Sequence, residues 1–194
     1  MSVQGAGAFA RHARSFAEAA LGRIRPAERR DAYVASLFVS DERDDPTRPT
    51  AAVGFNTEAA VTAATARGAD PAAARWSYEH WLQNDLGTLA GERADPDGAR
   101  LRARWLGELA AHDGVTPIRA HGEEIADAFM ALLADVVLGL HRDGVIEAVF
   151  GRPIPMLIHG LEYQATLAGH NRRANPGRLA EPFVDWLNSL AREE

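Results

Sequence analysis

Apolar residues recur at helical spacing in four long stretches of the chain, which predicts four amphipathic helices around a common core. These stretches are Ala8–Arg25, Ala99–Ala111, Ala120–His141 and Arg178–Ala191. The third carries the widest apolar stripe, so we expect it to be buried on more than one side. Two further helices are expected, at Glu58–Arg67 and at Leu161–Arg173.

Three other stretches are rich in β-branched and aromatic residues, which predicts strands. They are Ala32–Ser40, Thr50–Phe55 and Pro153–His159. The polar run Asp41–Pro49 joins the first two, and a hairpin is their simplest connection. Pro155 cannot donate to a ladder, so it is expected in an edge strand or at the start of a strand. The predicted fold class is α+β: a small antiparallel β-sheet of about three or more strands packed against several α-helices, in one domain covering residues 1–194.

The amino-acid composition excludes several kinds of catalytic or binding site. The 194 residues include no Cys and no Lys, so all 21 basic residues are Arg. This excludes disulfides, thiol nucleophiles, Cys-bound metals, Schiff-base lysines and the phosphate-binding loop that needs Gly-Lys-Ser or Gly-Lys-Thr. The formal net charge of -6 offers no basic face to nucleic acid, so none is expected as a partner.

The chain starts without the charged segment and apolar run of a signal peptide. Its longest apolar stretch is interrupted by Asp135 and falls short of the roughly 20 residues that cross a bilayer. We therefore expect a cytoplasmic protein with no membrane partner. The absence of Cys agrees with a reducing compartment.

Several segments in their order along the chain carry a resemblance to a known family. They are Tyr33–Val39, Phe55–Glu58, Arg75–Trp81 and Asn171–Pro176, followed by Phe183 and Trp186. This order resembles an uncharacterised bacterial family designated domain of unknown function 4303. The resemblance covers nearly the whole chain and implies a compact single domain. It implies no activity and no catalytic residue.

The histidines are candidates for chemistry. None of the seven stands in a His-x-His or His-Glu-x-x-His pattern, so no metal and no cofactor is expected. His159 and Glu162 lie three residues apart just after a predicted strand, and a neutral histidine beside a carboxylate can act as a general base. The alternative is a histidine at a strand end with a local hydrogen bond and a solvated Glu162.

Two polar groups near helix ends have a functional and a structural interpretation. Asn56 precedes the predicted helix at Glu58, where exposed amides can bind an anion or be capped. Arg172 and Arg173 offer planar donors to a carboxylate or phosphate, or simply complement a helix C-terminus. Glu123 and Glu124 open the long helix, where they are expected to stabilise its N-terminus; the alternative is acid–base work if one of them is desolvated.

Trp76, Tyr78 and Trp81 concentrate aromatic rings in one short segment. Such a cluster is typical of a core beside a sheet, and also of a binding hot spot. A third possibility is a homodimer interface that covers these rings. The segment therefore predicts either core packing or a contact surface.

Two hypotheses about function follow. The first is a non-enzymatic domain that binds another protein, of the immunity or accessory type, with the aromatic segment and the acidic run Asp41–Asp45 as contact surfaces. The second is an enzyme for a small molecule that uses His159 and Glu162 as its acid–base pair. Either a monomer or a homodimer is compatible with the sequence.

Overall fold

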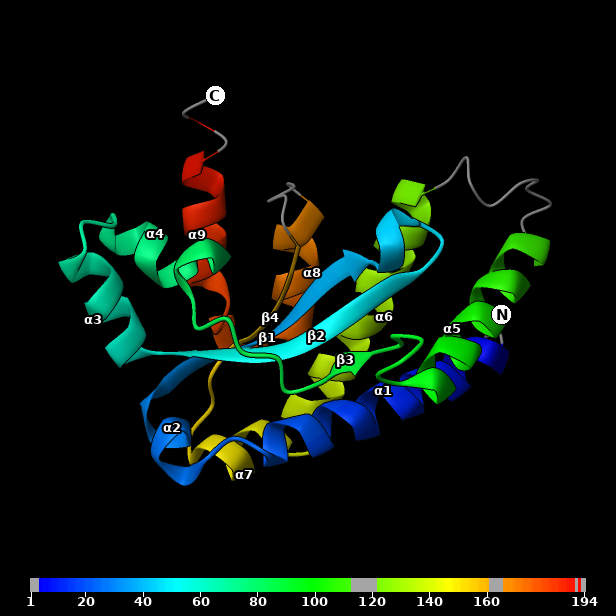
Figure 1. Ribbon diagram of the computed structural model, residues 1–194, viewed down its shortest axis with the longest axis horizontal. Coiled ribbons are helices and arrows are strands. Elements are labelled where there is room, and N and C mark those ends of the chain that lie inside the picture. The colour runs from blue at the N-terminus through cyan, green and yellow to red at the C-terminus, as the bar shows by residue number, and fades with distance from the viewer. Residues whose placement is uncertain (1–3, 113–121, 161–165, 191, 193–194) are drawn as a thin grey trace.

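The structure, a computed structural model, describes residues 4–112, 122–160, 166–190 and 192, with only the backbone at 110–112. Its helices are α1 (Gln4–Gly22), α2 (Pro26–Asp31), α3 (Glu58–Ala66), α4 (Pro71–Trp76), α5 (Pro96–His112), α6 (Gly122–Arg142), α7 (Val145–Phe150), α8 (Thr166–Ala174) and α9 (Glu181–Leu190). Its strands are β1 (Ala32–Asp41), β2 (Pro49–Thr57), β3 (Thr88–Leu89) and β4 (Met156–His159). Short 3-10 turns are η1 (Glu42–Asp44), η2 (Tyr78–His80) and η4 (Pro176–Arg178). Figure 1 shows their arrangement.

The four strands form one sheet in the order β3-β2-β1-β4. β1 and β2 form the predicted antiparallel hairpin, with Leu37 opposite Val53. β4 runs parallel to β1, with Ile158 opposite Leu37. The α+β class is therefore confirmed, but the sheet is mixed where an antiparallel sheet was expected. An apolar run shows that a strand is buried and leaves its direction open, which depends on the helices that lead to it.

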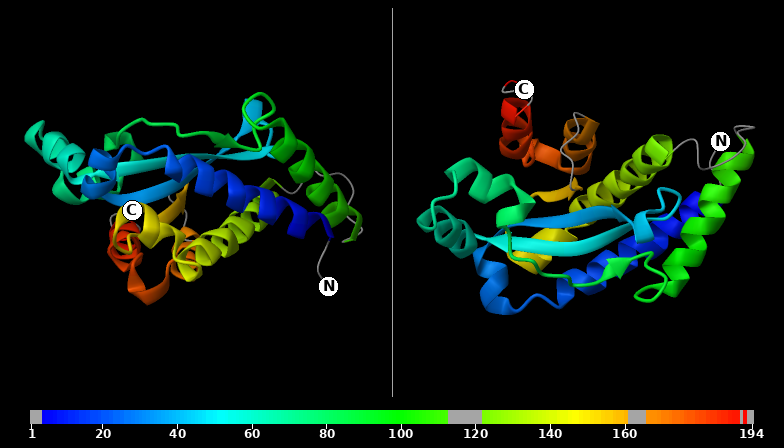
Figure 2. Two further views of the ribbon diagram at one scale, coloured as in Figure 1. Left: turned by 90° about the horizontal axis from the view of Figure 1, so that it is seen from below. Right: turned by 45° about the horizontal axis from the view of Figure 1, so that its top comes forward.

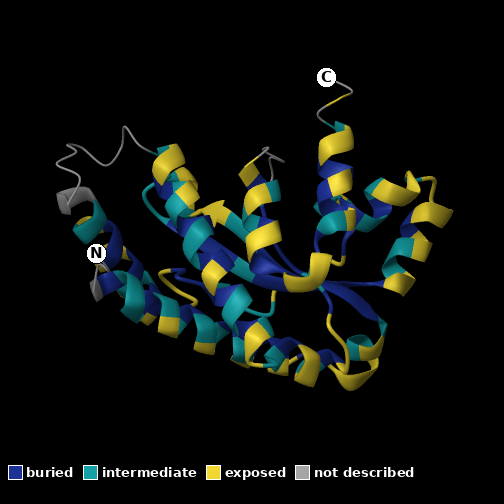
Figure 3. Ribbon diagram, turned by 180° about the vertical axis from the view of Figure 1, so that it is seen from behind, coloured by how far each residue is buried: buried dark blue, intermediate teal, exposed yellow. Residues whose placement is uncertain are grey.

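The two faces of the sheet differ in character. Leu37, Val53 and Ile158 belong to one face, which packs against α1 and α6. The opposite face carries Ser36 and Gly54 and is crossed by the segment 77–84. Seen from behind, most strand residues are buried, and exposed residues lie mainly on the outer sides of the helices, in loops and at the end of β1 (Figure 3). The alternation of side chains along each strand produces these two faces.

Two short helices of the fold begin at prolines. Pro26 starts α2 and Pro71 starts α4. Proline suits the first turn of a helix, because the amide that it lacks would have no partner there. Asp70 caps α4 by accepting hydrogen bonds at 2.9 Å from the amides of Ala72 and Ala73. Each of these two prolines therefore marks the start of a helix.

Two asparagine side chains pair with the free edge of β4 in place of a further strand. Asn171 accepts a hydrogen bond from the Ile158 amide at 2.9 Å and donates to the Ile158 carbonyl at 2.8 Å. Asn175 accepts from the Met156 amide at 2.7 Å and donates to the Met156 carbonyl at 3.1 Å. The two asparagines are only 0% and 3% exposed. The amide and the carbonyl of Met156 and of Ile158 thus have hydrogen-bond partners away from water.

The spacing of the two asparagines explains why this pairing works. Four residues of helix advance about 6 Å, and two residues of strand advance about 6.6 Å. Asn171 and Asn175 therefore stand opposite Ile158 and Met156 when the end of α8 lies along the strand. The same contacts place β4, and with it His159, at a fixed position beside β1.

Replacing Asn171 by Ala should lower the free energy of unfolding by about 2–4 kcal/mol, because the Ile158 amide and carbonyl would stay buried without partners. Urea denaturation followed by circular dichroism measures this change. Asn188→Ala on α9 is the control: Asn188 is exposed, and its loss should cost less than about 0.5 kcal/mol. Equal effects of the two substitutions would contradict the edge-pairing role.

Candidate functional site

The two tryptophans of the aromatic segment lie in the core. Trp76 and Trp81 are 8% and 5% exposed. The Trp76 ring packs edge-on against Tyr33, with centroids 5.7 Å apart, and lies 6.0 Å from the Phe183 ring. The Trp81 indole donates to the carbonyl of Arg75 at 2.8 Å, which satisfies its polar atom. The core interpretation is therefore right for both, and the binding or dimer surface is wrong, because neither ring is open to a partner.

Asn56 is a structural residue. Its side chain is 0% exposed, accepts a hydrogen bond from the Leu82 amide at 3.3 Å and donates to the Tyr33 hydroxyl at 3.1 Å. Nearby, Asn84 accepts from the Phe55 amide at 3.0 Å and donates to the Phe55 carbonyl at 2.8 Å. These bonds attach the segment 77–84 to β2. Both ends of the buried Asn56 amide therefore have a partner within the chain.

Two amides at the start of α3, those of Ala59 and Ala60, already have acceptors from the chain. The Ala60 amide donates to Thr57 Oγ1 at 3.2 Å, so Thr57 is the helix cap. The Ala59 amide donates to an Asp31 carboxylate oxygen at 3.1 Å. The anion-binding interpretation is wrong here, since the chain supplies its own acceptors. The capping interpretation is confirmed.

His159 is enclosed by aromatic rings. It is 2% exposed, and its ring centroid lies 5.5, 5.1 and 5.2 Å from those of Phe38, Tyr78 and Trp81. Neither ring nitrogen makes a well-formed hydrogen bond, although the Gly160 backbone interacts with the ring. Burial lowers the pKa of His159 to about 4, and the Gly160 backbone opposes this shift only in part. The ring is therefore neutral at pH 7.

This environment does not favour the proposed acid–base pair. A general base must reach a substrate proton, and the His159 ring is closed off from solvent. Glu162 lies outside the described residues. Tyr78, the third candidate of the aromatic segment, is half-buried and stacks on Phe38 with ring centroids 4.3 Å apart. Both rings belong to the wall around His159.

Arg172 and Arg173 already hold carboxylates of neighbouring helices. Arg172 donates from two nitrogens to Glu181 of α9, at 3.0 and 3.1 Å. Arg173 donates to Asp135 of α6 at 2.8 Å. The two side chains connect α8 to α9 and to α6, at exposed positions. They do not form a shared anion site, because each one points to a different helix.

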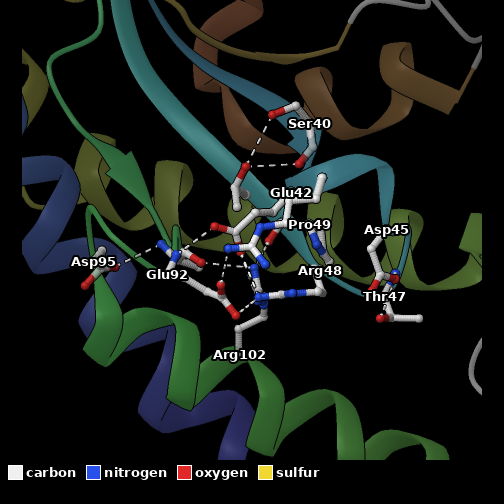
Figure 4. A network of polar contacts seen from close by, with 12 residues as sticks. Ser40, Glu42, Asp45, Thr47, Arg48, Pro49, Glu92, Asp95 and Arg102 are labelled. Atoms are coloured by element: carbon white, nitrogen blue, oxygen red, sulfur yellow. Dashed lines mark hydrogen bonds and ion pairs between the residues drawn. The ribbon is translucent and has the colours of Figure 1, made fainter.

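A network of charges gathers at the hairpin end, which we define as residues 41–49 (Figure 4). The Glu42 carboxylate accepts from the Glu92 amide at 2.9 Å and from Arg48 at 3.2 Å. Arg48 also pairs with the Glu92 carboxylate, and Arg43 lies 3.3 Å from it. The network joins the turn after β1 to the loop after β3, two segments that are distant in sequence.

Arg102 of α5 lies beneath this network and is 3% exposed. Its Nη1 donates to the carbonyls of Pro49 and Ala90, each at 3.0 Å. Its Nε has no hydrogen-bond partner, and its Nη2 lies 4.0 Å from a Glu42 oxygen, beyond hydrogen-bond distance. Burial lowers the pKa of Arg102, and the attraction of Glu42 only partly offsets this.

Sequence reasoning missed Arg102. A signal was present: Arg102 stands three and four residues before Trp105 and Leu106, and therefore on the buried side of the helix. A charged residue at such a position is rarely buried unless its charge is used. Its acceptors, at residues 49 and 90, could not have been found from spacing alone.

Two hollows lie beside the hairpin end, which stands between α6 and α5 (Figure 2, right). The acidic hollow, of about 820 Å³, is lined by Asp41, Pro46, Gly122, Glu123, Glu124, Ala126, Asp127, Ala128, Met130 and Thr166. The arginine hollow, of about 660 Å³, is lined by Thr47, Arg48, Glu92, Pro96, Ala99, Arg100, Arg102, Ala103, Leu106 and Gly107. The two hollows share no residue and differ in charge.

Comparison with known proteins adds no relative: no family model matches the chain, and neither a curated protein nor a solved structure does. The resemblance drawn from the sequence therefore stays a prediction. Within the described ranges, no group of three His, Asp or Glu side chains could hold a metal ion. No helix in those ranges is long and apolar enough to cross a bilayer.

The buried His159 should make the stability depend on pH. Its pKa in the folded protein, about 4, lies below the value of 6.5 for an exposed histidine, so the unfolded chain binds the proton more tightly. The stabilisation is complete above pH 6.5 and is lost as the pH falls towards 4, up to about 3 kcal/mol. Urea denaturation at several pH values measures it.

The His159 contribution is the difference between the wild type and His159→Phe, which has no ionisable ring. Between pH 7 and pH 4 the wild type should lose up to about 3 kcal/mol more than the variant. His80→Gln, a change at a partly exposed histidine, should leave the wild-type dependence in place. A His159→Phe variant that loses as much stability as the wild type would contradict the assignment.

Proposed function

We propose that this chain is a non-enzymatic protein-binding domain of the immunity or accessory type, acting in the bacterial cytoplasm, and that it recognises a basic segment of a partner protein. The observation that carries the proposal is the acidic hollow between the hairpin end and α6. A concave surface with one sign of charge suits a protruding segment of the opposite charge.

The described lining of the hollow is acidic. Four carboxylates line it, from Asp41, Glu123, Glu124 and Asp127, and no arginine is among the described lining residues. Asp127 also contacts His170 at 2.8 Å. Partial burial and the neighbouring charges of Asp45 and Asp44 raise the pKa of Asp41. A cation arriving from a partner would relieve this repulsion, so the site favours arginine or lysine.

The shape of the hollow depends on close packing at its base. Gly122, at the start of α6, approaches Pro46 so closely that a Cβ on Gly122 would lie 2.8 Å from the Pro46 Cβ. Pro46, Ala126 and Met130 add apolar surface beside the carboxylates. Methionine adapts to irregular partners, and apolar contact adds affinity that charge alone does not supply. The combination supports a segment with both cationic and apolar side chains.

The enzyme hypothesis has less support. It needs an acid–base group within reach of a substrate, and His159 is enclosed by Phe38, Tyr78 and Trp81. The protein-binding proposal needs no catalytic group. It retains the acidic part of the surface considered from the sequence and drops the aromatic part, because Trp76 and Trp81 are buried.

Two double variants that change the net charge equally test the acidic hollow. Asp41→Asn with Glu123→Gln removes two charges from the hollow. Glu147→Gln with Asp185→Asn removes two exposed charges from α7 and α9. Binding of a labelled arginine-rich peptide that carries a leucine, measured by fluorescence anisotropy at fixed ionic strength, should weaken about fivefold or more in the first and less than about twofold in the second.

The same pair of variants identifies the natural partner. A protein recovered from the host on the wild type should be lost on the hollow variant and retained on the control, and should present a basic segment. Equal weakening of both variants would show attraction to net charge alone. Unchanged binding to the hollow variant would place the contact on another surface. Either result would overturn the proposal.

A further inference from the structure

The arginine hollow carries an inference that is independent of the proposed function, because it shares no lining residue with the acidic hollow. We propose that this hollow is a binding site for a small organic carboxylate. Its volume of about 660 Å³ lies within the range of small-molecule sites in proteins. The argument rests on the hydrogen bonds that Arg102 makes and on the ones that it does not make.

The guanidinium of Arg102 is held firmly on one side only. Nη1 is fixed by two carbonyls, those of Pro49 and Ala90. Nε and Nη2 form the other edge of the planar group, and their N–H bonds point the same way, which is the geometry that grips a carboxylate with two parallel hydrogen bonds. On that edge Nε has no partner, and the Glu42 oxygen lies 4.0 Å from Nη2.

A buried arginine with a vacant edge is costly to the protein. Buried polar atoms are almost always hydrogen-bonded, and buried charges are paired. Arg102 is 3% exposed, and the carboxylates around it are already occupied: Glu42 and Glu92 hold Arg48. A ligand oxygen at the vacant edge would supply what the chain itself does not.

The rest of the hollow indicates what such a ligand looks like. Arg48 and Arg100 also line the hollow, each paired with a carboxylate of the chain, and Glu92 is the only acidic residue among its described members. Ala99, Ala103 and Leu106 of α5 form an apolar floor, since residues three and four apart share one side of a helix. A planar monocarboxylate with a compact apolar body matches both the arginine side of the hollow and this apolar floor.

Phosphate is the competing ligand class, and Glu92 argues against it. The Glu92 carboxylate pairs with Arg48 and Arg43 at the rim of the hollow. A phosphate dianion beside this carboxylate would meet stronger repulsion than a monoanion would. A carboxylate also fits the two-nitrogen edge of Arg102 in one plane. Both features favour the carboxylate.

Nuclear magnetic resonance on the full chain can observe the vacant edge directly. The Nε–Hε signal of Arg102 is followed during titration with sodium benzoate, with sodium chloride and sodium phosphate at matched ionic strength. We expect a saturable shift with benzoate, and neither saturation with chloride nor tighter binding of phosphate. No saturable shift with benzoate, or tighter binding of phosphate, would overturn the proposal.

Two variants with matched controls locate the binding. Ala103→Leu fills the hollow from an exposed position of α5, and Ala63→Leu makes the same change on exposed α3. Arg102→Lys keeps the charge but loses the planar edge of the guanidinium. Arg104→Lys makes the same change at an exposed arginine two residues further along α5. Ala103→Leu and Arg102→Lys should each weaken benzoate binding about tenfold or more, the loss expected for a charge-assisted hydrogen bond.

The controls at residues 63 and 104 should bind benzoate as the wild type does. Binding to the two lysine variants is followed by calorimetry, since Arg102→Lys has no Nε–Hε signal. If Arg102→Lys does not fold, Ala103→Leu alone decides, because a larger side chain on an exposed helical position is tolerated. Unchanged benzoate binding to Ala103→Leu, or equal loss in Ala63→Leu, would overturn the site.

Discussion

Each backbone amide and carbonyl at the edge of a sheet needs a hydrogen-bond partner when water is kept away, and in this chain asparagine side chains supply several of them. β4 has four residues and β3 only two, so the strands alone leave buried backbone groups unpaired. Asn171 and Asn175 pair with β4, and Asn84 pairs with β2. The positions of α8 and of the segment 77–84 follow from these bonds.

These contacts also determine what surrounds the hairpin. Because the segment 77–84 is attached to β2, Tyr78 and Trp81 lie against the sheet and enclose His159. Because α8 is attached to β4, its first residue, Thr166, reaches the acidic hollow. The hairpin end is left between two helices, with opposite charge on its two sides. The hydrogen bonds between asparagine side chains and the strand edges thus help to determine where both hollows lie.

The local pattern was enough to predict the hairpin, the main helices and the α+β class, because apolar spacing reports which residues face a core. It did not predict the direction of β4, which depends on the path of the chain through α6 and α7. It left both a functional and a structural role open for Asn56, Arg172 and Arg173. Polar residues near a helix end look alike in sequence whether they meet solvent, a ligand or a distant backbone group, and here each meets a distant part of the chain.

The asparagine pair at β4 also has a consequence for how molecules of this protein meet at high concentration. An unpaired strand edge is a template on which another chain can add its own strand, the first step of sheet growth between molecules. At Met156 and Ile158 the groups that would accept such a strand are already bonded to side chains. The buried Asn171 and Asn175 thereby protect the four-residue strand β4 from pairing with another chain.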